Sequence, residues 1–211
     1  MADLNYIAAG RINTTPLDLN GNLEKILKQC AQAVKEGVSI IAFPELCISG
    51  YNCGDLFWHS ELTKGALHTL LNLKYSLPEG IVAGVGLPLT GSDNKTYDAY
   101  VLLKKSCIIG VSVLHSCYNS CDSRVRFFRT PCVDDLSFNI GSEIFTPNNT
   151  FDIELNASAK RVGVYFNEGD LSYLNGVDLL ICPEAKRFEL SDDKKRVVDA
   201  VSLSSSLHCS V

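Results

Sequence analysis

The sequence lacks a long hydrophobic run: no apolar stretch in its 211 residues approaches the roughly 18 residues that a membrane-spanning helix requires. Its first residues show no basic segment followed by an apolar stretch and a small-residue cleavage site, so we expect no secretory signal. Positive charge is also not in excess, because 19 basic residues stand against 24 acidic ones. This balance argues against a surface for nucleic acid or for an anionic membrane. We therefore expect a cytoplasmic protein with neither partner.

Cysteine, in contrast, is plentiful, with nine residues. In a reducing compartment these cysteines would remain thiols, and several are interpreted as small apolar residues of buried strands. Cys117 and Cys121 form the only closely spaced pair, and no second Cys or His pair lies at zinc-finger spacing. We expect no metal site, and a zinc site near His115 is the less favoured alternative. No dinucleotide or phosphate-binding motif is complete, so no cofactor is expected either.

Apolar periodicity predicts alternating strands and helices, which is typical of a single α/β domain with a mixed sheet. Helical spacing with start and stop signals predicts helices over these residues: 18–36, about 62–73, 170–174 and 191–207. Apolar runs predict strands over these residues: 5–12, 38–43, 81–87, 97–103, 108–114, 151–155, 161–166 and 177–182. Residues 116–149 show no regular pattern. Because residues 81–114 hold three successive strands without a helix, part of the sheet should be antiparallel.

The most informative segment is the strand and turn that contain Glu45. A buried strand ends in Phe43-Pro44-Glu45, and α/β folds place ligands in the loops that follow such strands. Apolar surroundings would raise the pKa of this carboxyl group toward the range that a general base needs. A carboxylate that caps the turn or pairs with an arginine is an equally good interpretation of the pattern alone.

The whole segment over residues 40–57, IIAFPELCISGYNCGDLF, resembles the first signature of the nitrilase, or carbon–nitrogen hydrolase, superfamily. Its second half, GYNCGDLF, is most similar to the glutaminase domain of glutamine-dependent NAD⁺ synthetases. Further matches follow in the family's order and spacing: Gly84–Pro88, Tyr97–Val101, Ile109–Val111, Arg126–Phe128 and Arg161–Val164. The resemblance covers essentially the whole chain.

This resemblance implies a nitrilase-like α-β-β-α sandwich with mixed sheets, formed by residues 1–211 as one carbon–nitrogen hydrolase-like domain. The helices over 18–36 and 191–207 should pack side by side on one sheet. The family domain normally continues some tens of residues further, so the resemblance also implies an incomplete C-terminus. A homo-oligomer is expected, because family members typically pair helices across subunits.

The resemblance also implies a Glu-Lys-Cys mechanism, in which a thiol attacks an amide carbon and a cation stabilises the oxyanion. Glu45 matches the general base, and Tyr51 is a candidate binding residue. The position of the lysine is occupied by Leu114, or by Val113 if the alignment shifts by one residue. Asn167 stands where the nucleophilic cysteine is expected. Glu168 matches the acidic residue that follows it.

Because both the cation and the nucleophile are replaced, we expect a catalytically degenerate glutaminase-like domain that is kept as a structural or assembly unit. Glu45 should still lie close to Asn167, in a neutral pocket that raises the carboxyl pKa. One alternative is an active amidase that uses a non-standard cysteine, such as Cys47, Cys117 or Cys121. Another is a module that binds an amide or nucleotide without hydrolysis.

The synthetase half of such an enzyme is not expected in this chain. No Ser-Gly-Gly-x-Asp-Ser segment, the ATP pyrophosphatase loop of the synthetase domain, occurs in the sequence. An NAD⁺ synthetase domain is therefore expected only in a longer chain or as a separate partner.

Overall fold

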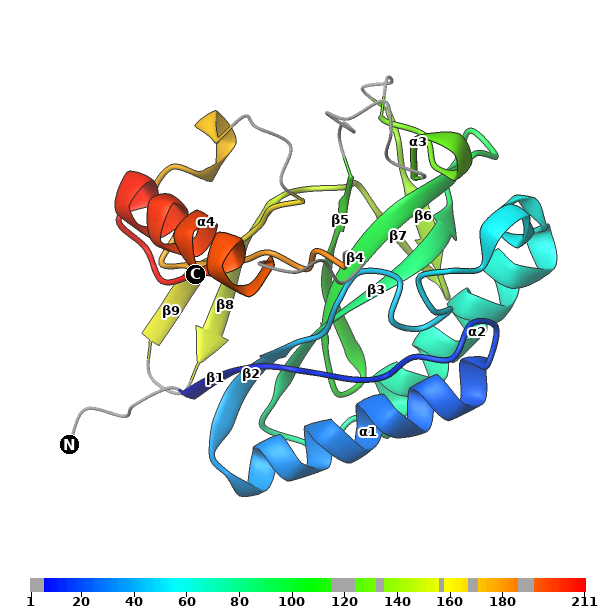
Figure 1. Ribbon diagram of the computed structural model, residues 1–211. Helices are drawn as coiled ribbons and strands as arrows, with labels where there is room; N and C mark the ends of the chain where they lie inside the picture. The colour runs from blue at the N-terminus through cyan, green and yellow to red at the C-terminus, as the bar shows by residue number, and fades with distance from the viewer. Residues whose placement is uncertain (1–5, 115–123, 132–134, 156–157, 167–170, 186–191) are drawn as a thin grey trace.

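The computed structural model describes residues 6–114, 124–131, 135–155, 158–166, 171–185 and 192–211, and it arranges them in four layers (Figure 1). Two helices cover one face of a five-stranded sheet, a three-stranded sheet lies against the other face, and a third helix covers the far side of the smaller sheet. The predicted α-β-β-α sandwich is therefore confirmed. In the described part of the chain, no helix has both the length and the hydropathy to cross a membrane.

The five-stranded sheet has its strands in chain order. They are β1 (Tyr6–Ala9), β2 (Val38–Ala42), β3 (Val82–Thr90), β4 (Thr96–Lys104) and β5 (Cys107–Val113). β1, β2 and β3 run parallel, whereas β3, β4 and β5 are antiparallel to one another. The sheet is thus mixed, and its antiparallel part is the predicted run of successive strands.

The smaller sheet is also mixed. It contains β8 (Thr150–Leu155), β9 (Ser158–Val164) and β10 (Leu179–Ile181), with β8 antiparallel and β10 parallel to β9. A 3-10 turn, η2 (Ser172–Leu174), precedes β10 and corresponds to the predicted short helix. The described part of 116–149 is more regular than predicted, because it holds α3 (Arg124–Phe127) and a hairpin of β6 (Phe138–Ile140) and β7 (Glu143–Phe145).

The first helical layer consists of α1 (Leu19–Lys35) and α2 (Ser60–Ser76), which contact each other over the larger sheet. The side chain of Asp18 caps α1 by accepting a hydrogen bond from the Gly21 N–H at 2.9 Å, and Gly37 follows the helix with a φ of 75°. A 3-10 helix, η1 (Gly54–Trp58), leads into α2. Buried apolar residues of both helices, including Ile26 and Leu70, form one core with the sheet.

The helix α4 (Asp192–Leu207) does not lie beside α1, so the prediction that these two helices pack side by side is wrong. Its Leu203 and Leu207 pack against a cluster that contains Tyr165 and Leu180 on the outer face of the smaller sheet. Successive strand residues face opposite sides, and Ile181 belongs to the core between the sheets instead. α1 and α4 therefore cover the two outer faces of the sandwich.

Candidate functional site

Glu45 lies where strands of the two sheets end. It begins the turn that follows β2 and the two residues Phe43 and Pro44, and it is only 1% exposed. Its Oε1 accepts a hydrogen bond from the Ala185 N–H at 2.7 Å, and its own N–H donates to the Pro183 carbonyl at 2.6 Å. Because Pro183 and Ala185 follow β10, these bonds tie the end of the larger sheet to the end of the smaller one. The carboxylate thus occupies the kind of strand-end position in which α/β folds place ligands.

Gly86 of β3 gives the turn the space that it needs. A Cβ atom at this position would stand less than 3.0 Å from backbone atoms of Glu45 and Leu46. The Gly86 carbonyl accepts a hydrogen bond from the Ile48 N–H at 3.1 Å, and its N–H donates to Cys47 Sγ at 3.4 Å. Sequence reasoning used Gly86 only as part of a family motif. A glycine inside a strand pattern was the available signal for close backbone approach.

Two further buried side chains donate hydrogen bonds to the backbone around this turn, and neither was a predicted site residue. The Tyr100 hydroxyl, fully buried, donates to the Phe43 carbonyl at 2.8 Å. Asn22 of α1, also fully buried, donates through Nδ2 to the carbonyls of Ile48 at 3.1 Å and Thr15 at 2.8 Å. An asparagine on the same helical face as buried apolar residues was the available signal for Asn22.

The two candidates for the lysine position face different layers. Leu114 follows β5, is buried, and belongs to the core between the two sheets. Val113 belongs to the core beneath α1 and α2. Glu45 hydrogen-bonds to residues that follow β10 of the smaller sheet. Of the two candidates, Leu114 lies on the face of the larger sheet that is turned toward the smaller one. An aliphatic side chain there supplies no positive charge.

Asn167 and Glu168 lie outside the described residues, as do His115, Cys117 and Cys121. The nearest described residue is Phe166, which is buried in the same core as Leu114. The proximity of Glu45 and Asn167 therefore stays a prediction.

Tyr51 lies in the loop after the Glu45 turn and is partly buried. It packs against a buried cluster that includes Leu46, Phe57 and Phe128. Its predicted role in binding stays a prediction.

The buried cysteines near the turn are poor nucleophiles. Burial raises the pKa of Cys47 to about 12, although the Gly86 N–H bond opposes the shift, and burial raises the pKa of Cys30 to about 12 as well. At neutral pH such groups are thiols, whereas the thiolate is the reactive form. Among the residues that the structure describes, no cluster of three or more potential metal ligands occurs.

The α-β-β-α sandwich has the layer order expected of a nitrilase-like fold, and a buried glutamate lies where strands of its two sheets end. The sequence pattern of the carbon–nitrogen hydrolase family matches residues 6–113, and the chain belongs to this family. Sequence relatives include the glutamine-dependent NAD⁺ synthetase of Aquifex aeolicus, which is 29% identical over 67% of this chain and 26% of that protein. The bovine (Bos taurus) enzyme is 34% identical over 39% of this chain, but only 12% of that protein is covered.

Solved structures show the same fold. A glutamine-dependent NAD⁺ synthetase from Cytophaga hutchinsonii superposes with a TM-score of 0.82 at 24% identity, covering 96% of this chain and 34% of that one. An amidase double mutant from Nesterenkonia sp. AN1, in complex with acrylamide, gives a TM-score of 0.71 at 14% identity and covers 98% of this chain and 74% of the amidase. This chain thus spans about a third of the synthetase and about three quarters of the amidase.

Proposed function

We propose that this chain is a carbon–nitrogen hydrolase domain of the glutaminase type that has lost catalysis and serves as a structural or assembly unit. The observation that supports the proposal is that Leu114, which the family resemblance aligns with the catalytic lysine, is a buried aliphatic side chain in the core between the sheets. An amide-cleaving site stabilises an oxyanion with positive charge or N–H donors, and leucine offers neither. Asn167, at the nucleophile position of the sequence, has no thiol. Loss of the nucleophile alone costs about a millionfold in a well-studied hydrolase.

The buried environment of Cys47 counts against the alternative of a non-standard cysteine. This thiol lies two residues after Glu45 in the sequence, but burial raises its pKa, so it is a thiol and not a thiolate at neutral pH. The Gly86 N–H donates a hydrogen bond to Cys47 Sγ, so this sulfur contacts β3 inside the buried turn. The Glu45 carboxylate accepts a hydrogen bond from the Ala185 N–H, and this structural role does not require hydrolysis of an amide.

Glutamine hydrolysis by wild type and restored variants tests the proposal. We expect no ammonia release from wild type or from Asn167→Cys, and detectable release from Asn167→Cys combined with Leu114→Lys. The matched control is Asn167→Cys with Val113→Lys, since that side chain faces the helical layer. Circular dichroism verifies that each variant is folded. Wild-type hydrolysis that thiol alkylation abolishes would establish the amidase alternative, and glutamine-induced thermal stabilisation without turnover would establish the binding alternative.

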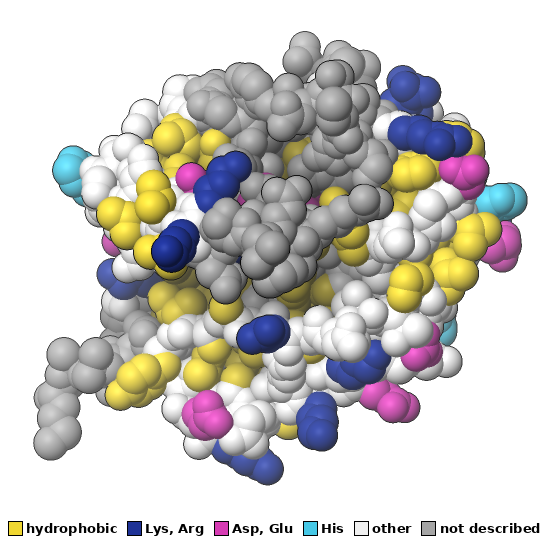
Figure 2. Space-filling view, in the orientation of Figure 1, with side chains coloured by type: hydrophobic (Ala, Val, Ile, Leu, Met, Phe, Trp, Pro, Cys, Tyr) yellow, Lys and Arg dark blue, Asp and Glu magenta, His cyan; other side chains and the backbone are white. Residues whose placement is uncertain are grey.

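The assembly role receives support from α4. Val197, Val198 and Val201 are 63%, 65% and 61% exposed, although they are adjacent on one helix. Hydrophobic side chains appear on the surface over α4 in Figure 2. Contiguous exposed apolar side chains mark interaction sites more often than isolated ones do. We propose that this helix contacts a second copy of the chain, and that an NAD⁺ synthetase domain, in a longer chain or separate, is a further partner.

Sedimentation of wild type and Val201→Lys tests the self-association. Wild type should sediment above the monomer mass of 23.1 kDa, and Val201→Lys should shift toward the monomer because a charge replaces buried apolar contact. Ile144→Lys is the matched control, since Ile144 is also an exposed apolar residue, at 73%, but lies on β7. A monomeric wild type at high concentration, or an equal effect of both substitutions, would contradict the proposal.

A further inference from the structure

A groove of about 560 Å³, which we call the α1 groove, lies between α1 and the segment that follows β1. Four cationic side chains line it: Arg11, Lys25, Lys28 and Lys35. No aspartate or glutamate among the described residues belongs to this lining. The segment after β1 runs along α1 in Figure 1, and Figure 2 shows Lys and Arg side chains on this face. Because the whole chain has a net charge of -5, the α1 groove is a local exception to the sign of the molecule.

The three lysines form a row along α1. Lys25, Lys28 and Lys35 are three and seven residues apart, and helical residues at such spacings share one face. At a rise of 1.5 Å per residue, the row is about 15 Å long. Arg11 contributes positive charge from the opposite wall. A row of this length exceeds a single carboxylate or phosphate and matches about five residues of an extended polypeptide.

No carboxylate of the described residues neutralises these cations. The ion pairs of the described part of the chain include none of the four. Lys25 Nζ donates instead to uncharged groups, the Asn13 carbonyl at 2.9 Å and the Thr15 hydroxyl at 3.2 Å. Glu24 and Glu36 flank the row in the sequence but do not line the groove. The α1 groove therefore presents positive charge that is available to a negatively charged partner.

Hydrogen bonds hold the two walls of the α1 groove together. Gln29 Nε2 donates to the Arg11 carbonyl, and Asn22 Oδ1 accepts from the Thr15 N–H at 2.9 Å. Both side chains come from α1, and both partners belong to the segment after β1. A groove that is formed before binding lowers the entropic cost of ordering its walls around a partner.

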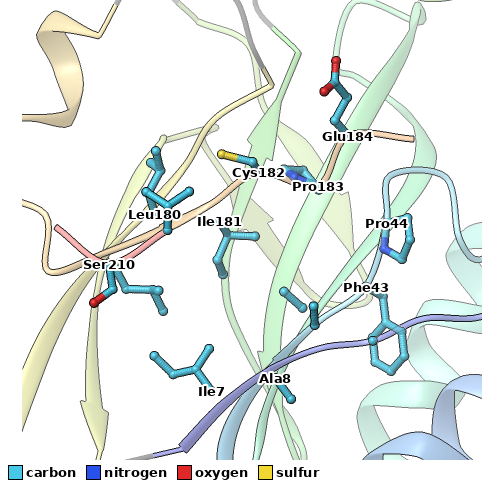
Figure 3. Close-up of a pocket in the computed structure, with 15 residues that line it drawn as sticks. Ile7, Ala8, Phe43, Pro44, Leu180, Ile181, Cys182, Pro183, Glu184 and Ser210 are labelled. Carbon is cyan, nitrogen blue, oxygen red and sulfur yellow. The ribbon is translucent and has the colours of Figure 1, made fainter. Parts of the chain in front are cut away.

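Positive charge is not a property of every hollow on this molecule. Another hollow is lined by residues of β1, β2 and β10, and apolar side chains such as Ile7 and Ile181 lie around it (Figure 3). Its described lining contains no lysine or arginine. The concentration of cations is thus specific to the α1 groove.

The composition of the lining favours an acidic polypeptide over nucleic acid. Sites for single-stranded nucleic acid combine cations with aromatic rings on which bases stack. The described lining of the α1 groove has no aromatic ring, and its apolar part consists of Ile12 and Ala31. An extended acidic polypeptide, in contrast, places carboxylates on one side about every 7 Å, where lysine and arginine can pair with them.

We propose that the α1 groove binds an extended acidic segment of a partner polypeptide, whose carboxylates pair with Arg11, Lys28 and Lys35. The proposal goes beyond the loss of catalysis and does not depend on it, because the groove includes neither Glu45 nor Leu114.

The test uses the full chain and a fluorescein-labelled peptide in which about five glutamates alternate with serine. We expect saturable binding by fluorescence anisotropy at low salt, and no binding of the same peptide with glutamine in place of glutamate. The affinity should fall at least about tenfold at high salt, because the Debye length shrinks from about 10 Å at 0.1 M to about 3 Å at 1 M. An oligothymidylate of equal charge should bind more weakly than the peptide. Tighter binding of the oligothymidylate, or peptide binding that salt does not affect, would overturn the proposal.

Matched charge reversals decide whether binding occurs at the α1 groove. Arg11→Glu and Lys28→Glu, one on each wall, should each weaken binding by at least about fivefold, because repulsion replaces attraction. Lys104→Glu makes the same change in net charge at an exposed position outside the groove, and it should leave the affinity within about twofold. Thermal melting shows whether the variants are folded. An equal effect of all three substitutions would overturn the proposal.

Carbodiimide cross-linking locates the peptide on the wild-type chain without any substitution. The reagent joins a carboxylate to an adjacent amine, so mass spectrometry should find peptide attached at Lys28 and Lys35 in preference to Lys104. Cross-links spread evenly over exposed lysines would contradict a defined site in the α1 groove.

Discussion

Replacing Gly86 by alanine should displace the Glu45 turn, because the added methyl group would meet backbone rather than a movable side chain. The new Cβ would stand less than 3.0 Å from atoms of Glu45 and Leu46. Overpacking of this kind costs about 1–3 kcal/mol. The gain from a stiffer unfolded chain offsets about 0.4–1 kcal/mol of that cost. We therefore expect a net loss of about 1–2 kcal/mol in the free energy of unfolding.

Urea denaturation measures this loss, and amide exchange locates it. In Gly86→Ala, the amide exchange rate of Ala185 should rise more than the rates of the amides that pair β3 with β4, because the Ala185 N–H donates to Glu45. Gly110→Ala is the matched control: it also overpacks a strand glycine, but its Cβ meets the ring of Phe151. That variant should lose stability without a selective rise at Ala185. Wild-type stability of Gly86→Ala, or the same exchange pattern in both variants, would refute the reasoning.

Three further predictions concern buried polar groups. Burial raises the pKa of Cys30 and Cys47 from 9.0 to about 12, so the stability they confer is complete below pH 9 and is lost as the pH rises toward 12. The unfolding free energy should fall by about 1.4 kcal/mol per pH unit per thiol above pH 9, and Cys47→Ala should reduce this slope in urea denaturation. Asn22→Leu should cost about 1–3 kcal/mol per backbone group left unsatisfied, measured the same way. Glu45→Gln should stay near wild-type stability, whereas Glu45→Ala should lose about 1–3 kcal/mol; equal losses would contradict a purely hydrogen-bonding role.

Local patterns were sufficient to predict most strands and helices. The strands β3, β4 and β5 are separated only by short polar turns, and such spacing allows antiparallel neighbours alone. Both ends of α1 were equally readable, because Asp18 caps its start and Gly37 follows its end.

The position of α4 could not be read in this way. Its pattern identifies apolar residues, but a helical period does not specify which sheet the helix will meet. Val197 and Val201 share the helical spacing with Leu207, but both valines are exposed, whereas Leu203 and Leu207 contact the smaller sheet. The hairpin of β6 and β7 was missed because each strand has only three residues, too few to show alternation.

The candidate site was likewise only partly predictable from the sequence. Glu45 was found because its motif is contiguous in the sequence. Its hydrogen-bond partner Ala185 lies 140 residues away, and the glycine that makes room for the turn lies on another strand. A strand glycine indicates a close backbone approach but not which segment approaches, and the bond from Ala185 depends on how the two sheets pack together.

This geometry changes how the retained Glu45 is to be interpreted. A buried carboxylate between sheet ends can act as a proton carrier, but it also accepts the Ala185 N–H, which would otherwise lose its partner. A chain that has lost a cation and a nucleophile would still need an acceptor there, because an unsatisfied buried N–H is costly. Retention of Glu45 is therefore expected whether or not the domain hydrolyses amides. Under the proposed loss of catalysis, the informative positions are Leu114 and Asn167, because neither residue takes part in that hydrogen bond.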